Sequence, residues 1–359
     1  MQAILLVGGK GTRLRPLTNT TPKPMLPVAG VPFTAHQIAR ARDAGVTRIV
    51  LGTSYRAEVF AEYFGDGSDF GVELVCRTEQ EPLGTGGGIR YAAEALTCAP
   101  DESVLVFNGD VLSGVDLRHL VAEHERTRAA VTLYLTRVSD PRAFGLVPTD
   151  ADGRVIEFRE KPTTPEEIVT DQINAGCYVF RRDVIDRIPA GEVVSVERDT
   201  FPALLAEGER LTGVVDDGYW LDLGTPLSFV RGSADLVLGR VDSSAVPGPT
   251  GERLVLGDAR VAAGADVTGG SVVADSCVVA EGAVVAGSVL MPGVVVSPGA
   301  VVRDSVVATG ARVGERAELT GTVVGEGAVV GADVELVDGA RVWPGSVIPD
   351  GSIRFSSDR

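Results

Sequence analysis

Several residue types are scarce in this sequence, and each scarcity narrows what the protein can be. Aromatic residues make up only 5% of the 359 residues, so aliphatic side chains must fill most of the core. Basic residues are outnumbered, with 33 Lys and Arg against 49 Asp and Glu and a net charge of -16. Because nucleic acids and anionic membranes are polyanions, this balance argues against both as partners. A small anionic substrate stays possible, since a few fixed cations can hold one.

Long apolar runs and paired cysteines are also missing. No apolar stretch approaches the roughly 20 residues that a membrane-spanning helix needs. The first seven residues have no basic flank and no cleavage site, so we interpret them as a strand rather than a signal peptide. None of the four cysteines, Cys76, Cys98, Cys177 and Cys277, forms a Cys-x-x-Cys pair. We expect buried free thiols, no membrane anchor and a cytoplasmic location.

The chain changes its hydrophobic period near residue 240. Over residues 1–240, aliphatic runs alternate with helical patterns, which predicts an α/β domain with a Rossmann-like, mostly parallel sheet. An Asp-Gly turn at Asp152 and Gly153 predicts a hairpin between residues 144–148 and 154–158. Residues 241–251 are rich in Ser, Pro and Gly and are predicted to be a linker. The expected strands are residues 4–7, 48–51, 72–76 and 104–107, and the expected helices are residues 33–44, 57–64 and 89–96.

Aliphatic residues recur nearly every six positions in residues 252–359. Sixteen positions from Val261 to Ile348 are joined by fifteen steps, of which twelve span six residues and three span five. This period fits no α-helix, but it fits a coil whose short strands each point one aliphatic residue inward before a tight corner. With three faces per coil, the fifteen steps predict five stacked coils of a parallel β-helix. A Val- and Gly-rich sandwich with regular turns is the alternative.

The first expected strand runs into a glycine-rich loop, Gly8-Gly9-Lys10-Gly11-Thr12-Arg13. Glycines let backbone N–H groups approach phosphates without obstruction by a Cβ atom. The loop does not match GxxxxGK[ST], and it lacks the third glycine of the dinucleotide fingerprint. Two cations sharpen the signal: Arg13, and Lys23 between two prolines that fix the backbone around it. The combination predicts a polyphosphate site, and a surface turn with solvated charges is the alternative.

These residues resemble the signature of a known family. Gly-Gly-x-Gly-Thr-Arg-Leu at residues 8–14, followed by Pro-Lys-Pro-Met at 22–25, is similar to that of sugar-1-phosphate nucleotidyltransferases. The longer form over residues 6–18 looks most like that of GDP-mannose pyrophosphorylases, also called mannose-1-phosphate guanylyltransferases. The resemblance extends over essentially the whole chain. It implies a nucleotidyltransferase domain, a left-handed hexapeptide-repeat β-helix, and GTP, α-D-mannose 1-phosphate and pyrophosphate as reactants and product.

The resemblance also implies where the nucleotide binds. Glu81 is the candidate reader of guanine, because a carboxylate accepts well from the adjacent N1–H and N2–H₂ donors. A solvated loop residue is the alternative for Glu81. The expected nucleotide-binding residues are Leu6, Gly8, Gly9, Gly11, Thr12, Arg13, Glu81, Pro82, Gly84, Thr85, Asn108 and Gly109.

Two aspartates are expected to hold Mg²⁺. Asp110 follows an apolar strand, and Asp222 stands in an apolar run, where a lone carboxylate is costly unless it is paired or binds a metal. Mg²⁺ prefers oxygen ligands and keeps waters, so two carboxylates with phosphate oxygens suffice. The resemblance implies that Asp110 and Asp222 are these ligands. A loop-capping carboxylate and a buried ion pair are their respective alternatives.

The resemblance assigns the sugar phosphate to Gly145, Glu160, Lys161 and Asn174. Glu160 and Asn174 would bind sugar hydroxyls, Lys161 would hold the phosphate, and Gly145 would line the pocket. A sugar 1-phosphate is already a charged nucleophile, so no catalytic base is needed. The expected catalytic residues are Arg13, Lys23, Asp110, Lys161 and Asp222, acting by positioning and charge neutralisation.

Other functions stay open at this point. Another base, or glucose, a heptose or a cyclitol phosphate, would fit the same signature. A hexapeptide-repeat acyltransferase is disfavoured, because all three histidines, His36, His119 and His124, precede the repeats. A non-catalytic regulatory subunit is disfavoured, because the two cations and both aspartates are present. We expect a homo-oligomer, whose order the sequence does not show.

Overall fold

The computed structural model describes residues 1–353, which divide into two compact units. One unit consists of Met1–Gly9 and Gln37–Trp220, and the other combines Lys10–His36 with the chain from Leu221 onward. The cationic opening segment therefore belongs to the same compact unit as the C-terminal repeats. The boundaries proposed above, with domains at residues 1–240 and 252–359 and a linker at 241–251, stay a prediction.

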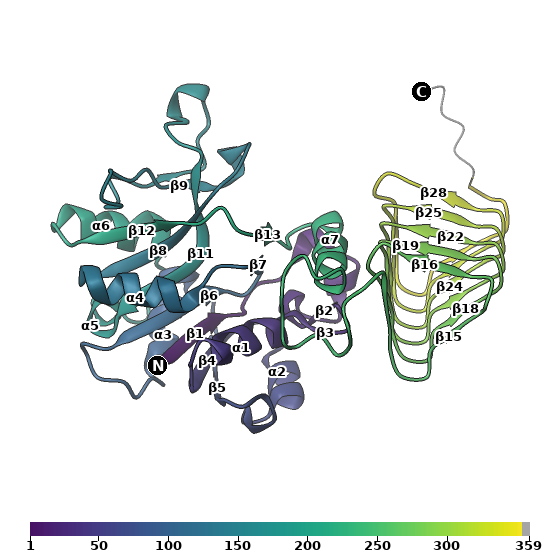
Figure 1. Cartoon of the computed structure of the whole chain (residues 1–359), viewed down its shortest axis with the longest axis horizontal. Coiled ribbons are helices and arrows are strands. Elements are labelled where there is room, and N and C mark those ends of the chain that lie inside the picture. The colour runs from purple at the N-terminus through teal and green to yellow at the C-terminus, as the bar shows by residue number, and fades with distance from the viewer. Residues whose placement is uncertain (354–359) are drawn as a thin grey trace. The chain divides into compact units, whose positions relative to one another are not determined.

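The first unit is built on a nine-stranded, mixed sheet (Figure 1). Its strands are β1 Gln2–Leu6, β4 Arg48–Thr53, β5 Glu73–Thr78, β6 Ser103–Asn108, β8 Val131–Arg137, β9 Gly145–Leu146, β10 Arg159–Glu160, β11 Gln172–Arg181 and β12 Leu211–Val215. The order is β10-β9-β11-β6-β1-β4-β5, with β8 pairing β11 and β12. β6, β1, β4 and β5 are parallel, whereas β11 runs antiparallel to β6. All four predicted strands and the mostly parallel α/β class are confirmed.

Helices cover both faces of this sheet. They are α1 Phe33–Asp43, which spans both units, α2 Ala57–Phe64, α3 Gly84–Ala93, α4 Leu117–Thr127, α5 Arg182–Asp186 and α6 Phe201–Ala206. One core joins Ile4 of β1 with Ile89 of α3 and Phe201 of α6. On the opposite face, His124 of α4 is bonded to Thr132, which alternates with inward-facing neighbours along β8.

Two predicted elements are shifted along the chain. The third helix begins at Gly84 instead of residue 89. Glycines are poor helix formers, but here they form the first turn, because the N–H groups of Gly86 and Gly87 donate to the Val194 carbonyl. The hairpin is present, with Leu146 facing Arg159 and Gly145 facing Glu160. Its second strand is therefore at Arg159–Glu160 rather than at residues 154–158, since residues 154 and 155 make only single bridges.

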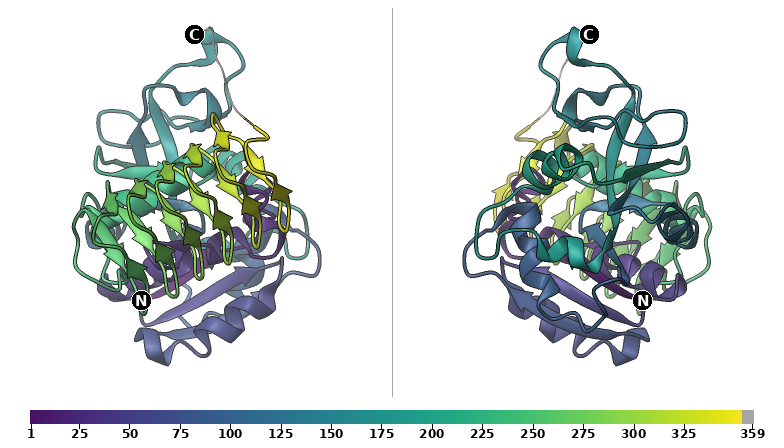
Figure 2. Two further views of the ribbon diagram at one scale, coloured as in Figure 1. Left: turned by 90° about the vertical axis from the view of Figure 1, so that its right-hand side faces the viewer. Right: turned by 90° about the vertical axis from the view of Figure 1, so that its left-hand side faces the viewer.

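The C-terminal repeats form three parallel sheets of six, six and five strands (Figures 1 and 2). Val272 pairs with Val289 and Arg253 pairs with Ser271, so a coil takes 17 or 18 residues. The first sheet contains β14 Arg253–Val255, β17 Ser271–Val273, β20 Val289–Leu290, β23 Val306–Val307, β26 Val323–Val324 and β29 Arg341–Val342. The second contains β15 Arg260–Val261, β18 Val278–Val279, β21 Val295–Val296, β24 Arg312–Val313, β27 Val329–Val330 and β30 Val347–Ile348. The third contains β16 Asp266–Thr268, β19 Val284–Ala286, β22 Val301–Arg303, β25 Glu318–Thr320 and β28 Glu335–Leu336.

The predicted six-residue series lines the core of these coils. Val261 and Ile348, at the two ends, are partly buried, and the other fourteen members are buried. These are Val267, Val273, Val279, Val285, Leu290, Val296, Val302, Val307, Val313, Leu319, Val324, Val330, Leu336 and Val342. The parallel β-helix is thus confirmed, and its left-handed sense stays a prediction.

The outer face of the first repeat sheet is buried as well. Val272, Val289, Val306 and Val323 alternate with core residues, yet they are only 0–3% exposed. At one edge of this sheet, a Cβ atom on Gly30 would lie 2.6 Å from Leu256 and in ordinary contact with Leu254, at 3.6 Å. At the other edge, the Arg341 guanidinium donates to the Arg15 carbonyl at 2.6 Å. The opening segment Lys10–His36 is therefore anchored to the β-helix at both edges of this sheet.

The remaining elements connect these parts. They are β2 Pro27–Val28, β3 Val31–Pro32, β7 Val111–Ser113, β13 Trp220–Asp222 and α7 Pro226–Val237. In α7, the Ser233 hydroxyl accepts from the Ala29 N–H at 2.9 Å. The predicted linker has no helix or strand but is folded, because the Gly251 N–H donates to the Val237 carbonyl at 2.7 Å.

The burial of the cysteines differs in part from the prediction, as the accessibility of the four side chains shows. All four cysteines are free, but only Cys177 and Cys277 are buried, while Cys76 and Cys98 are half-buried. The expectation of buried thiols was therefore wrong for two of them: Cys76 lies on the edge strand β5, and Cys98 lies between α3 and β6. Across residues 1–353, no helix is both long and apolar enough to cross a membrane.

A buried histidine makes stability depend on pH. The Nε2–H of His36 donates to the Val28 carbonyl at 2.8 Å, and Nδ1 accepts from the Ser243 hydroxyl at 2.7 Å. Burial lowers the pKa of His36 to about 4, against the opposing effect of the Val28 hydrogen bond. An unfolded histidine, with a pKa near 6.5, takes up a proton that the folded state refuses. Stability is therefore full above pH 6.5 and falls as the pH drops toward 4.

We predict that His36 accounts for about 2 kcal/mol of the stability lost between pH 7 and pH 5. His36→Gln should be less stable than the parent at pH 7, but its free energy of unfolding should fall less steeply with pH. Urea unfolding at several pH values measures both slopes. His119→Gln, at an exposed position, is the control and should keep the parent slope. Equal slopes in the parent and His36→Gln would contradict the prediction.

Candidate active site

The carboxyl edge of the parallel strands brings the first predicted residues together. Leu6 and Asn108 face each other across β1 and β6. The Gly109 N–H donates to the Leu6 carbonyl at 2.8 Å, and a Cβ atom at Gly109 would fall on that oxygen. A Cβ atom on Gly8 would lie 2.8 Å from the Ser54 hydroxyl. Four predicted nucleotide residues thus share one sheet edge, where ligands of such folds bind.

The predicted base loop connects β5 to α3. Glu81, Pro82 and Gly84 are exposed. Thr85 is half-buried, and its hydroxyl donates to Glu197 at 2.8 Å and accepts the Val196 N–H at 2.9 Å. The hydroxyl of Thr85 is therefore engaged by protein groups rather than directed freely at a ligand.

Glu79 is a candidate that the sequence reading missed. It is half-buried one residue beyond β5, and a Cβ atom on Gly88 would lie 2.7 Å from its Oε1. Burial raises the pKa of Glu79, and the hydrogen bond from the Leu83 N–H at 3.4 Å acts in the opposite direction. The signal was available, because Glu79 is the first carboxylate after a predicted parallel strand.

Three adjacent strands hold the predicted sugar-phosphate residues. Gly145 on β9 faces Glu160 on β10, and a Cβ atom at Gly145 would lie 2.7 Å from Glu160 Oε2. The exposed Lys161 places its Nζ 3.5 Å from Glu160 Oε1. Asn174 lies on β11, where its amide donates to the Tyr178 hydroxyl at 2.7 Å and its Oδ1 accepts the Gly176 N–H at 3.1 Å. The structure therefore brings all four residues into one region.

A bulge in β11 shapes this region. The pairing register with β8 shifts between Asn174 and Tyr178, which leaves residues 175–177 unpaired with β8, although Cys177 pairs with Phe107 of β6. The Trp220 indole donates to the carbonyl of Ala175 in this bulge at 3.1 Å and meets the Phe144 ring edge-on at 5.4 Å. The sequence reading missed both Tyr178 and Trp220, although only the partners of Trp220 are distant along the chain and Asn174 is four residues from Tyr178.

The second unit gathers the predicted cations around one carboxylate. Asp222 Oδ2 lies 3.8 Å from Arg13 Nη2, and Asp222 Oδ1 lies 3.7 Å from Lys23 Nζ. The Lys23 side chain is 11% exposed, Asp222 is 27% exposed and Arg13 is 66% exposed. Two glycines make room: a Cβ atom at Gly11 would lie 2.7 Å from Lys23 Cβ, and one at Gly224 would lie 2.6 Å from Arg13 Nη2.

Thr12, Gly9 and Asp110 are the remaining residues of the predicted site. Thr12 precedes Arg13 in a short 3₁₀ turn, Thr12–Leu14, and Gly9 has open space where a side chain would start. Asp110 is half-buried between β6 and β7 in the first unit. Within residues 1–353, no group of three or more His, Cys, Asp or Glu residues is arranged to hold a metal ion. The magnesium site predicted from sequence has two carboxylates, so this finding does not test it.

Comparison with known proteins decides the family. A model described as nucleotidyl transferase matches residues 2–237, and one described as the GMPPB C-terminal domain matches residues 250–357. Mannose-1-phosphate guanylyltransferase of Mycobacterium tuberculosis is 55% identical over 359 residues, which covers 100% of this chain and 98% of that protein. The chain belongs to the nucleotidyl transferase family, among the mannose-1-phosphate guanylyltransferases. The resemblance inferred from the glycine loop is thereby confirmed.

Other relatives match a smaller share of this nucleotidyl transferase. Mannose-1-phosphate guanylyltransferase catalytic subunit beta of Drosophila pseudoobscura pseudoobscura is 40% identical over 232 residues, or 64% of this chain and 61% of that protein. The crystal structure of HddC from Yersinia pseudotuberculosis superposes with a TM-score of 0.55 at 27% identity. The superposition covers 65% of this chain and 97% of HddC.

We predict that Gly109→Ala disables this nucleotidyl transferase, because its methyl group would displace the backbone that joins β1 to β6. A shift of about 1 Å at a reaction centre lowers rates by roughly two orders of magnitude. Pyrophosphate release under saturating substrates measures the loss. Gly114→Ala is the matched control, since its nearest contact, Tyr219 Cβ at 3.6 Å, is ordinary packing. Full activity in folded Gly109→Ala would contradict the prediction.

Proposed function

We propose that this nucleotidyl transferase is a mannose-1-phosphate guanylyltransferase. It transfers GMP from GTP to α-D-mannose 1-phosphate and yields GDP-mannose and pyrophosphate. The observation that carries the proposal is the cationic pair Arg13 and Lys23, held on Asp222 beside a glycine-rich turn. The relative that is 55% identical over the full chain supports the same reaction.

The reaction needs charge neutralisation more than proton transfer. An oxygen of the sugar phosphate attacks the α-phosphorus of GTP, a new O–P bond forms, and the bond to the β-phosphate oxygen breaks as pyrophosphate departs. The proposed role of Lys23 is to stabilise charge at the α-phosphate, and that of Arg13 is to stabilise the departing pyrophosphate. Because Lys23 is 11% exposed, its charge is screened less than that of a surface lysine.

Mg²⁺ is the proposed cofactor, with Asp110 and Asp222 as its protein ligands. The donor set fits the ion, since it offers carboxylate oxygens and the substrates add phosphate oxygens. When bound, the ion would neutralise charge on the phosphates. Asp222 also has a second role in the protein itself, because it orients Arg13 and Lys23.

For guanine we propose Glu79 as the acceptor ahead of Glu81. Both carboxylates could receive the N1–H and N2–H₂ donors, but Glu79 is half-buried and Glu81 is exposed. A hydrogen bond to a charged, partly desolvated acceptor contributes more than one in open water. For the sugar, we keep Glu160 and Asn174 as partners of the hydroxyls, with Lys161 on the phosphate and Gly145 leaving space for Glu160.

We expect GTP with mannose 1-phosphate to be the best pair in a matrix of substrates. The matrix sets GTP, ATP, UTP and dTTP against mannose, glucose, a heptose and a cyclitol 1-phosphate, with pyrophosphate release as the readout. Activity should disappear with excess EDTA and return with Mg²⁺. A faster rate with another base or sugar would move the assignment within the family, and no pyrophosphate with any pair would overturn it.

We predict that Lys23→Ala lowers turnover by about two orders of magnitude, the usual loss when one charge-stabilising donor is removed. Lys23→Arg should recover part of the rate, since it restores the charge at a different geometry. Arg312→Ala, on the exposed face of β24, removes an equal charge far along the sequence and serves as the control. Wild-type turnover in Lys23→Ala with an intact fold would refute the role of this lysine.

A further inference from the structure

The first turn of α3 is tied to a distant segment by side chains that the proposed reaction does not use. The Thr85 hydroxyl donates to Glu197 Oε2 at 2.8 Å and accepts the Val196 N–H at 2.9 Å. The Ser195 hydroxyl donates to the same Glu197 oxygen, also at 2.8 Å. Glu197 is half-buried, and its Oε2 atom joins the first turn of α3 to residues 195–197.

The backbones of the same two segments are in direct contact. The Val194 carbonyl accepts the N–H groups of Gly86 at 2.8 Å and Gly87 at 3.3 Å, and the Val194 N–H donates to the Leu83 carbonyl at 2.9 Å. Helix N-termini leave such N–H groups without intrahelical partners, so this carbonyl caps α3 from outside. A Cβ atom at Gly84 would lie 2.6 Å from the Val194 oxygen. The glycines in the first turn of α3 are thus needed for this close approach.

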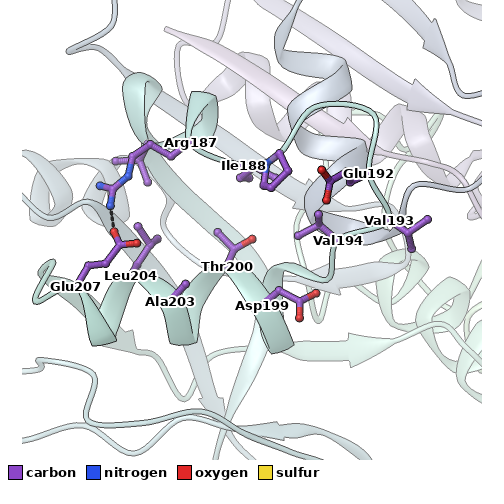
Figure 3. A pocket seen from close by; sticks show the side chains of 12 residues that line it. Arg187, Ile188, Glu192, Val193, Val194, Asp199, Thr200, Ala203, Leu204 and Glu207 are labelled. Atoms are coloured by element: carbon purple, nitrogen blue, oxygen red, sulfur yellow. Dashed lines mark hydrogen bonds and ion pairs between the residues drawn. The ribbon is translucent and has the colours of Figure 1, made fainter.

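Packing holds the segment only in part: Val194 and Val196 are buried in the core that also contains Ile89 of α3. Residues 192–194, with Asp199 and Thr200, line a cavity of about 390 Å³ between α5 and α6 (Figure 3). Val193 is 76% exposed. The attachment of the segment to α3 therefore combines this packing with the hydrogen bonds of Thr85, Glu197 and the Val194 backbone.

The base loop, residues 79–83, depends on this attachment. It begins at the end of β5 and ends at Leu83, whose carbonyl receives the Val194 N–H and whose own N–H donates to Glu79. A shift of the first turn of α3 would therefore carry the partner of Glu79 away from it.

We propose that Thr85 and Glu197 are positioning residues that fix the base loop and so determine the selectivity for guanine. The proposal rests on the proposed function, because it takes residues 79–83 as the site of the base. Neither side chain needs to touch the nucleotide. Their effect passes through Val194 and Leu83 to the carboxylate of Glu79.

Steady-state kinetics with GTP and ITP test this proposal, because ITP lacks the 2-amino group of guanine. Thr85→Val keeps the shape of the side chain but loses its hydroxyl, and Glu197→Ala removes the acceptor. Each should raise KM for GTP about tenfold, reduce the GTP-over-ITP ratio of kcat/KM at least about fivefold, and change kcat less than about threefold. Thr85→Ser and Glu197→Gln keep the hydrogen-bonding groups and should stay within about twofold of the parent.

Glu192→Gln is the matched control, since Glu192 is an exposed carboxylate of the same segment with no hydrogen bond from its side chain among the described contacts. It should leave KM and the ratio unchanged. An unaltered ratio in folded Thr85→Val and Glu197→Ala would overturn the positioning role, as would equal losses in the Ser and Gln variants. A parent enzyme that does not use GTP would instead overturn the proposed function, so the two failures are distinguishable.

Discussion

The half-buried carboxylate of Asp222 is the constraint on which the reactive part of this protein depends. It lies within 4 Å of both Arg13 and Lys23, and the side chain of Lys23 is only 11% exposed. A cation in that position is costly unless a counter-charge faces it. The negative charge of Asp222 offsets the repulsion between these two basic side chains and so allows them to stay close together. They form a local cationic site in a protein whose net charge is -16. Phosphate groups that enter would compete with Asp222 for these cations, which makes the same arrangement a means of binding polyanionic substrates.

Glycines, which have no side chain, are as important for the site as the charged residues. Gly109 lets β6 end against the Leu6 carbonyl, Gly11 gives Lys23 its place, and Gly145 leaves space for Glu160. In each case a methyl group would meet backbone or a functional side chain at less than contact distance. Close backbone approach therefore accounts for several glycines that a sequence reading would attribute to phosphate or base contact alone.

The coils of the β-helix pack on one another, and the β-helix also supports the opening segment of the chain. Its first sheet buries aliphatic residues on both faces, inward in the core and outward at positions such as Val289 and Val306. The opening segment is attached at both edges of that sheet, through Gly30 and through the contact of Arg341 with Arg15. The segment that carries Arg13 and Lys23 is therefore supported by a repeat domain whose rigidity comes from continuous parallel pairing.

Features that repeat or lie close together along the chain could be predicted from the residues alone. The six-residue period predicted a β-helix, because each inward position is specified by its own coil, and the alternating runs predicted a mostly parallel sheet. The glycine loop with Arg13 and Lys23 was likewise a local signal. Tertiary structure alone decided which partners these residues have. Thr85 meets Glu197 across 112 residues, and Glu79 rather than Glu81 became the sheltered carboxylate. Local patterns encode local geometry, whereas burial and hydrogen bonding at a site are set by segments that only the folded chain brings together.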